Sequence, residues 1–166
     1  AGMNAQDCAA DSAMALEVNA VATARLVQAA IRQKVKRIIY VSTIHAYGNP
    51  LTGAISEETA TAPVHPYAFS HRAGEDVVRA SHDSDEIEGI VIRLSNAYGA
   101  PASKNVNCWM LLANDLCRQA VTSGKLMLHS AGLQRRDFIS IHDVVRGIKH
   151  FMELPSDKCR SSFFNL

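Results

Sequence analysis

Two short runs rich in β-branched residues constrain the fold of this chain most. They span residues 38–43 (Ile-Ile-Tyr-Val-Ser-Thr) and 89–94 (Gly-Ile-Val-Ile-Arg-Leu), and both of their faces are largely apolar. Such runs are typical of central parallel strands covered by helices on both sides. A helical pattern at about residues 11–33 precedes the first run, and a second one at about residues 67–82 separates the two runs. The alternation predicts βαβ units in a right-handed, doubly wound α/β sheet.

The last third of the sequence predicts a second, smaller α+β lobe. After Pro101 we expect helices at about residues 106–121 and 142–154, and short strands at 125–129, 136–141 and 162–166. The predicted fold class is α/β, a partial doubly wound parallel sheet with a small α+β lobe. We expect residues 1–101 to belong to the sheet domain and residues 102–166 to the lobe, with the two parts interleaved.

Composition and charge narrow the class of protein. The 166 residues, 48% hydrophobic and 20% charged, are typical of a globular protein rather than a disordered one. A net charge of +1 gives no general field for nucleic acid. The longest apolar runs, 38–41 and 108–113, are far shorter than the roughly 20 residues that cross a bilayer. The four cysteines form no Cys-x-x-Cys pair, so we predict reduced thiols, no metal site and a cytoplasmic protein with neither nucleic-acid nor membrane partners.

Polar residues follow the predicted strands at the edge where ligands bind in open α/β sheets. Ser42 and Thr43 end the first run, and Asn96 follows the second. Tyr67 and His71 are four residues apart, so a helix presents both on one face. A phenol with a pKa of about 10 needs a nearby cation to act as a base, and His71 supplies one only when protonated. A core aromatic at a helix start and a solvated histidine remain open as alternatives.

The order of these motifs resembles the extended short-chain dehydrogenase/reductase family, which includes the nucleotide-sugar epimerases and dehydratases. The resemblance covers nearly the whole chain. In chain order the similar segments are Ala1-Gly2, 19–23 (Asn-Ala-Val-Ala-Thr), 41–48 (Val-Ser-Thr-Ile-His-Ala-Tyr-Gly), 67–71 (Tyr-Ala-Phe-Ser-His, in the place of Tyr-x-x-x-Lys), 93–99 (Arg-Leu-Ser-Asn-Ala-Tyr-Gly) and 136–144 (Arg-Asp-Phe-Ile-Ser-Ile-His-Asp-Val). The resemblance implies a Rossmann-like dinucleotide-binding domain and a nicotinamide cofactor, NAD or NADP.

The resemblance also implies a role for each site residue. Tyr67 exchanges a proton with a sugar hydroxyl or keto group, Thr43 polarises the same oxygen, and His71 takes the place of the family's lysine. The cofactor-binding residues implied are Ala1, Gly2, Tyr67, His71 and the backbone around Leu94. Asn96 and Arg136 contact the substrate, a nucleotide-diphosphate sugar, because a planar guanidinium suits paired phosphate oxygens. For Asn19, the resemblance suggests a bridge to backbone or water, and an ordinary exposed asparagine remains open.

Two departures from the family pattern bear on activity. If His71 replaces the family's lysine as the cation, activity rises as the pH falls toward its pKa, and a group titrates between about 5.5 and 7.5. The nine glycines are too sparse for a glycine-rich phosphate loop. We therefore expect these residues to be the middle part of a protein of about twice this length, in which the phosphate loop comes earlier.

Two further expectations concern the type of reaction and the oligomeric state. Sugar 4,6-dehydratases of the family carry two acidic residues after the threonine, where this chain has Ile44 and His45. The difference disfavours water elimination and leaves epimerisation or keto reduction. The resemblance also implies a homodimer that includes the helix carrying Tyr67.

Two other functions remain open. A catalytically impaired fragment, or a binding or assembly protein on the same scaffold, is favoured by His71 and the missing phosphate loop. Bound dinucleotide would distinguish an enzyme from it. A reductase of neutral ketones, of the steroid or flavonoid type, would leave Arg136 no diphosphate to bind.

Overall fold

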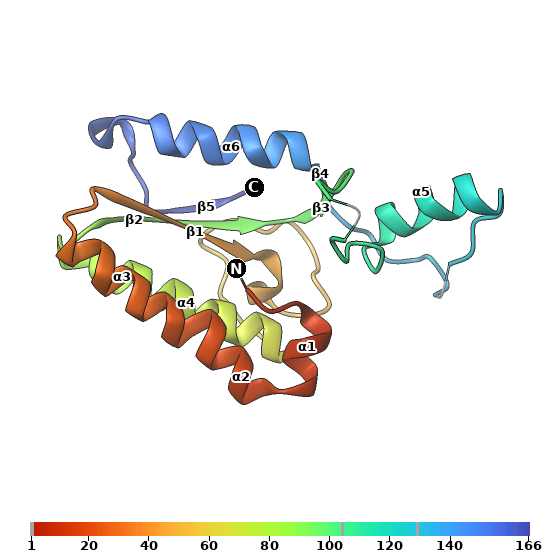
Figure 1. Cartoon of the computed structure of the whole chain (residues 1–166), viewed down its shortest axis with the longest axis horizontal. Helices are drawn as coiled ribbons and strands as arrows, with labels where there is room; N and C mark the ends of the chain where they lie inside the picture. Colours follow the sequence, from red (N-terminus) through yellow and green to blue (C-terminus); the bar gives the residue numbers. More distant parts are fainter. Residues whose placement is uncertain (1, 104, 129) are drawn as a thin grey trace. The chain divides into compact units, whose positions relative to one another are not determined.

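The computed structural model describes residues 2–103, 105–128 and 130–166. They form two compact units (Figure 1). Unit 1 contains the described residues up to Leu94 together with Ile148–Leu166, and unit 2 contains those of Ser95–Gly147. Units defined by contacts need not coincide with functional domains, so the division into residues 1–101 and 102–166 stays a prediction.

A three-stranded parallel sheet forms the centre of unit 1. Its strand order is β1–β2–β5, with β1 at Arg37–Thr43, β2 at Glu88–Leu94 and β5 at Phe163–Asn165. β1 pairs with β2 from Arg37 opposite Glu88 to Thr43 opposite Leu94, so the two strands end side by side. The middle strand, β2, has neighbours on both sides and a fully buried centre at residues 90–92. The α/β prediction is confirmed.

Helices cover one face of this sheet. The N-terminal stretch contains α1 (Ala5–Ala10), α2 (Ser12–Leu16), the π-helical turn η1 (Glu17–Val21) and α3 (Ala22–Arg32), and α4 (Pro66–Asp83) follows β1. α3 and α4 lie on the same side of the strands in Figure 1, and Val27, Val78, Ile87 and Val91 form a core cluster there. The two helical segments expected at 11–33 and 67–82 are thus confirmed.

A single glycine lets α4 approach the sheet closely. A Cβ at Gly74 would collide with the hydroxyl of Tyr40 on β1 and with the carbonyl oxygen of Asn19 in η1. The missing side chain therefore sets the distance between α4, β1 and η1. Pro66 in the first turn suits the helix start, where an N–H would have no helical partner.

The described residues of unit 2 form a small two-stranded parallel sheet and one helix that lies wholly within the unit. The strands are β3 (Asn96–Tyr98) and β4 (Phe138–Ser140), and the helix is α5 (Leu112–Thr122). α6 (Ile141–Glu153) begins in unit 2 and belongs to unit 1 from Ile148 onward, before the short η3 (Ser156–Lys158).

Three predictions for the last third of the chain need correction. The strand expected at 162–166 in the lobe is β5, and it pairs with β2 in the central sheet of unit 1. The helix expected from residue 106 begins at Leu112. The strand expected at 125–129 is absent from its described residues, 125–128. There the side chain of Gln119 replaces a neighbouring strand: its Oε1 accepts the Met127 N–H at 2.6 Å, and its Nε2 donates to the Met127 carbonyl at 3.2 Å.

The N-terminal helical stretch has one further property. Within the described residues, Ser12–Arg32 is long and apolar enough to cross a membrane by length and composition alone. A helix that packs on a protein core passes the same test, and this stretch contacts α4 through α2, η1 and α3. The expectation that the protein has no membrane partner stays a prediction.

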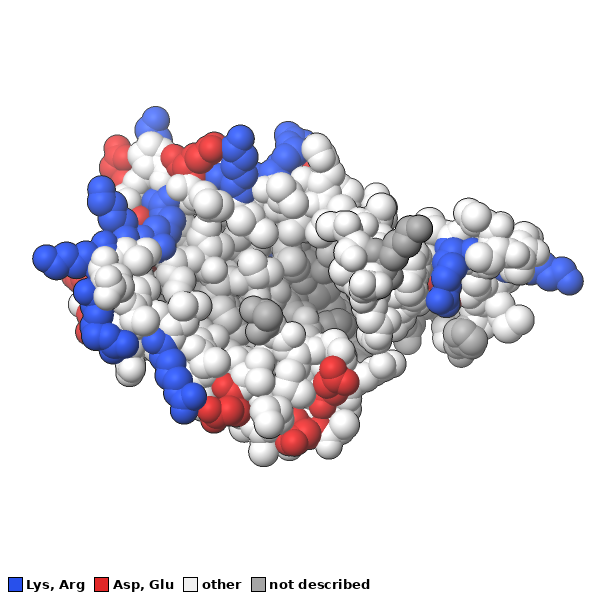
Figure 2. Space-filling model, in the orientation of Figure 1, with Lys and Arg blue, Asp and Glu red and all other residues white. Residues whose placement is uncertain are grey.

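Basic side chains gather where α3 ends and β1 begins (Figure 2). Arg32 is the last residue of α3, and the exposed Lys34 and Lys36 follow it. Cations are favourable at a helix C-terminus because the peptide dipoles leave partial negative charge there. The position of the cluster has a structural explanation that does not require nucleic acid.

Candidate active site

Thr43 and Tyr67 meet at the end of β1. Thr43 is the last residue of the strand and is 5% exposed, and its hydroxyl oxygen accepts the His45 N–H at 3.2 Å, which starts the short helix η2 (Ile44–Tyr47). Tyr67 is the second residue of α4. Burial raises the pKa of its phenol, and hydrogen bonding with the Thr43 side chain opposes that rise. The two hydroxyls that the sequence assigns to one substrate oxygen are therefore neighbours.

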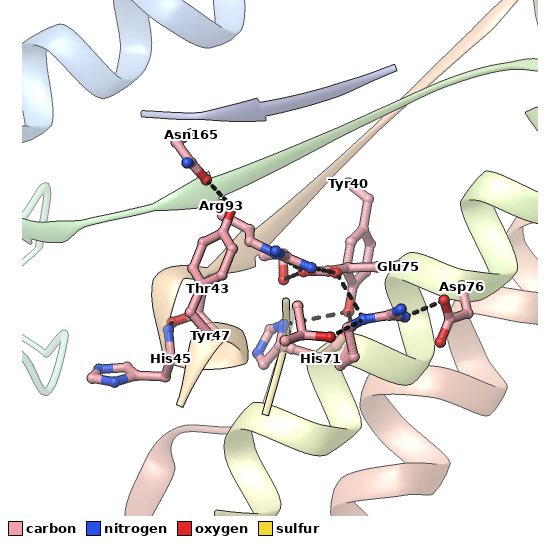
Figure 3. A network of polar contacts seen from close by, with 12 residues as sticks. Tyr40, Thr43, His45, Tyr47, His71, Glu75, Asp76, Arg93 and Asn165 are labelled. Atoms are coloured by element: carbon pink, nitrogen blue, oxygen red, sulfur yellow. Dashed lines mark hydrogen bonds and ion pairs between the residues drawn. The ribbon is translucent and has the colours of Figure 1, made fainter. Parts of the chain in front are cut away.

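His71 lies one helical turn after Tyr67, with its ring centroid 4.5 Å from the Tyr67 ring. The side chain is 8% exposed, and its Nδ1 is 3.3 Å from the Tyr40 hydroxyl (Figure 3). Burial lowers the pKa of the imidazole to about 4, although the nearby Glu75 carboxylate acts in the opposite direction. His71 is thus neutral at neutral pH, where a lysine would carry a charge, and it does not titrate in the range expected from the sequence.

The N-terminal segment passes close to His71. Ala1 lies outside the described residues. A Cβ at Gly2 would lie 3.1 Å from Asn19 Oδ1 and 3.5 Å from His71 Cε1, so the backbone at Gly2 packs closely against both side chains. Asn19 is 3% exposed; its Oδ1 accepts the Met3 N–H at 3.1 Å and its Nδ2 donates to Ser70 Oγ at 2.9 Å. Asn19 is therefore a buried bridge between the N-terminal segment and α4, not an exposed residue.

The residues present fit one end of a dinucleotide. Leu94 ends β2 directly opposite Thr43, and Gly2 packs closely against His71. These groups lie near the carboxyl ends of parallel strands, where nicotinamide rings are bound in such sheets. Among the described residues, no strand leads through a glycine-rich turn directly into a helix that could hold the diphosphate. The fit is thus limited to the nicotinamide end.

The two residues predicted to contact substrate lie together in unit 2. Asn96 begins β3 and donates from Nδ2 to the Asp137 carbonyl at 2.8 Å. The exposed Arg136 guanidinium lies 3.5 Å from Asn96 Oδ1 and donates to Gln134 Oε1 at 2.8 Å. Arg136 has no carboxylate partner among the described residues, so its charge remains available to an anion.

A buried polar network that the sequence does not predict lies behind Thr43 and Tyr67. It consists of Ser42, Glu75 and Arg93, each less than 5% exposed, and Figure 3 shows Glu75 and Arg93 facing one another. Two features of the sequence are consistent with such a network: an arginine lies inside an apolar strand, and a glutamate lies on the buried face of α4. Neither feature reveals that the two charges pair, because the pairing depends on how α4 crosses the sheet.

A parallel sheet with helices packed on it, and candidate site residues at its carboxyl edge, is the arrangement of a Rossmann-like α/β protein. The chain belongs to the NAD dependent epimerase/dehydratase family, whose model matches residues 3–166. It is 34% identical over 131 residues to the dTDP-D-glucose 4,6-dehydratase of Mus musculus, a match that covers 77% of this chain and 35% of the mouse protein.

Two solved structures are similar over most of the chain. The dTDP-glucose 4,6-dehydratase DesIV of Streptomyces venezuelae, with NAD and TYD bound, is 25% identical with a TM-score of 0.80 and covers 99% of this chain. The UDP-glucuronic acid 4-epimerase of Bacillus cereus, in complex with NAD, is 26% identical with a TM-score of 0.80 and covers 94%. This chain spans 48% of each of these two chains, about half their length.

Proposed function

We propose that this chain carries the proton-transfer part of an NAD(P)-dependent epimerase or keto-reductase acting on a nucleotide-diphosphate sugar. The observation that carries the proposal is the meeting of Thr43 and Tyr67 at the carboxyl end of β1. The family membership and the NAD-bound structural relatives support the choice of cofactor. When bound, the nicotinamide supplies hydride exchange with the reacting carbon.

The residues of this chain handle the proton and the oxygen. Tyr67 transfers a proton at the substrate oxygen, and the Thr43 hydroxyl donates a hydrogen bond to the same oxygen. Burial raises the pKa of Tyr67 and no charged His71 opposes it at neutral pH, so the phenol is protonated. A protonated phenol is ready to donate to a carbonyl oxygen. The resting site therefore favours reduction of a keto group over removal of a proton from a hydroxyl.

In unit 2, Arg136 and Asn96 provide binding groups for the substrate. An exposed guanidinium without a carboxylate partner suits a diphosphate, which offers paired oxygens. Replacing Arg136 by Ala should weaken binding of a nucleoside diphosphate about tenfold or more, the loss expected for a charge-assisted hydrogen bond. Isothermal titration with UDP and dTDP measures this loss, and unchanged affinity would favour a neutral substrate instead.

Epimerisation or keto reduction is preferred to dehydration because of the residues after Thr43. Ile44 and His45 form the start of η2, and neither carries a carboxylate. The His45 ring lies 6.4 Å from the Tyr67 ring, so a carboxylate at this position would stand near the proton-transfer group. Mass spectrometry of the reaction product distinguishes the reactions, because a product lighter by one water would overturn this preference.

A first experiment tests cofactor binding without requiring turnover. Native mass spectrometry of the protein as isolated, and after incubation with NAD(H) or NADP(H), reports the chain mass, the oligomeric state and any retained dinucleotide. Retained dinucleotide supports the proposal, and Tyr67→Phe should keep it while abolishing turnover. Tyr98→Phe, which removes a phenol in unit 2, is the matched control. The decisive sample is the longer protein in which the phosphate loop is expected, and retention of no dinucleotide there at saturating concentrations contradicts the proposal.

A non-catalytic binding or assembly protein is the second candidate. The specific observation in its favour is the buried, neutral His71 where the family pattern has a charged lysine. Saturable binding of a nucleotide sugar without any turnover would favour this candidate.

We also propose a cytoplasmic location and a homodimer. The described cysteines are all free thiols, as in a reducing compartment. The homodimer follows from the family resemblance, and the same native spectrum tests it.

A further inference from the structure

One buried carboxylate joins three structural elements behind the candidate site. Glu75 on α4 is fully buried, and Arg93 on β2 is 2% exposed. Arg93 donates from Nε to Glu75 Oε1 at 2.8 Å and from Nη2 to Oε2 at 2.5 Å, in a two-bond pair. Ser42 on β1 donates its hydroxyl proton to Oε1 at 2.5 Å. We call Ser42, Glu75 and Arg93 the Glu75 cluster.

Each member of the Glu75 cluster lies next to a candidate site residue. Ser42 directly precedes Thr43 and pairs with Arg93 across the sheet. Arg93 directly precedes Leu94, and Glu75 lies one helical turn after His71 and two after Tyr67. The cluster therefore ties the ends of β1 and β2 to α4. Its members lie one residue before Thr43 and Leu94 on the strands and one helical turn after His71 on the helix.

Two aromatic rings contact the guanidinium of Arg93. The Arg93 guanidinium carbon lies 4.3 Å from the Tyr47 ring centroid and 4.2 Å from the Phe163 ring centroid. The Tyr47 hydroxyl donates to Asn165 Oδ1 at 2.7 Å. Tyr47 ends η2, the short helix that Thr43 starts. The contacts of the cluster thus reach both ends of this helix, since Ser42 lies at one end and Tyr47 at the other.

Stability alone does not explain this arrangement. Taking two charges out of water costs several kcal/mol per ion, and a well-packed apolar replacement of such a pair is often neutral or stabilising. The pair instead fixes the orientation of the two side chains relative to one another, because a two-bond guanidinium–carboxylate contact tolerates little rotation.

We propose that the Glu75 cluster is a positioning device that holds the Thr43 hydroxyl against the Tyr67 hydroxyl by tying the ends of β1 and β2 to α4. The cluster acts through Thr43 and touches no substrate. Its importance for a reaction rests on the proposed function, but the geometry it sets is measurable without cofactor or substrate.

The test follows the hydrogen-bond state of Tyr67 at neutral pH. The 13C resonance of Tyr67 Cζ, assigned with Tyr67→Phe, reports the contacts of the phenol. Thr43→Val removes the hydroxyl directly and gives the full change in this resonance. Ser42→Ala should move the resonance in the same direction by part of that change, and Ser42→Thr, which restores a hydroxyl, should return it toward the wild-type position.

A double variant makes the test specific. In a Thr43→Val background, Ser42→Ala should cause no further change, because there is no longer a hydroxyl to hold. Val78→Ala, which removes core packing on the same helix, should lower stability and leave the Tyr67 resonance in place. The proposal is overturned if Ser42→Ala leaves the resonance unchanged while Thr43→Val moves it, or if Thr43→Val itself moves nothing. Failure to retain dinucleotide would count against the proposed function alone.

Discussion

Acid should destabilise this protein through one buried side chain, His71. Its pKa falls from 6.5 to about 4 on folding because burial disfavours the imidazolium. Between these two values the unfolded chain binds a proton at His71 that the folded chain does not bind. The free energy of unfolding therefore falls as the pH falls through this window, and the loss is complete once the folded-state pKa is passed. At about 1.4 kcal/mol for each pKa unit of difference, the loss is about 3 kcal/mol.

Urea unfolding followed by circular dichroism between about pH 7 and pH 4 measures this loss. Other groups also titrate in this range, so the useful quantity is the difference between wild type and His71→Gln, which keeps a polar partner for Tyr40. The wild type should lose about 3 kcal/mol more than the variant over the window. His142→Gln, at an exposed position in unit 2, controls for the removal of an imidazole. Parallel curves for wild type and His71→Gln would refute the reasoning.

Three further changes have direct structural consequences. The His71 ring centroid lies 4.5 Å from that of Tyr67, so His71→Lys would place a cation near the phenol. It should lower the Tyr67 pKa by roughly one to three pH units at an effective dielectric constant of about 20, as seen in a tyrosine titration. Gly74→Ala should cost about 1–3 kcal/mol in urea unfolding, because the new Cβ collides with Tyr40; full stability would contradict the close approach. Gln119→Ala should speed amide hydrogen exchange at Met127, whose N–H loses its acceptor, and unchanged protection would show another partner.

The sequence determined the secondary elements of unit 1. The β-branched runs at 38–43 and 89–94 became β1 and β2, and the helix starting near Tyr67 became α4. The pattern succeeds for β2 because a central strand that is buried on both faces, as residues 90–92 are, must be apolar on both. It failed at residues 125–128, where an apolar segment has its backbone bonded to the Gln119 side chain rather than to a strand. The local sequence pattern does not predict that the Gln119 side chain is the hydrogen-bond partner.

The sequence also predicted how two of the candidate site residues lie relative to one another. Thr43, Tyr67, Asn96 and Arg136 stand in recognisable motifs, and the spacing of Tyr67 and His71 predicted their shared helix face, which the structure confirms. This success has a physical reason: helix spacing and strand ends are local properties that the residue order encodes directly.

Only the tertiary structure decided the electrostatics of that site. From the sequence alone, His71 has the ordinary imidazole pKa of 6.5. Folding lowers this pKa to about 4 because it buries the ring beside Tyr40 of β1. The sequence assigns Glu75 and Arg93 two separate charges, and the strand register and the close approach of α4 make them one buried pair. A pKa and an ion pair depend on what surrounds a group in space, and residues brought together from 18 or more positions apart supply those surroundings.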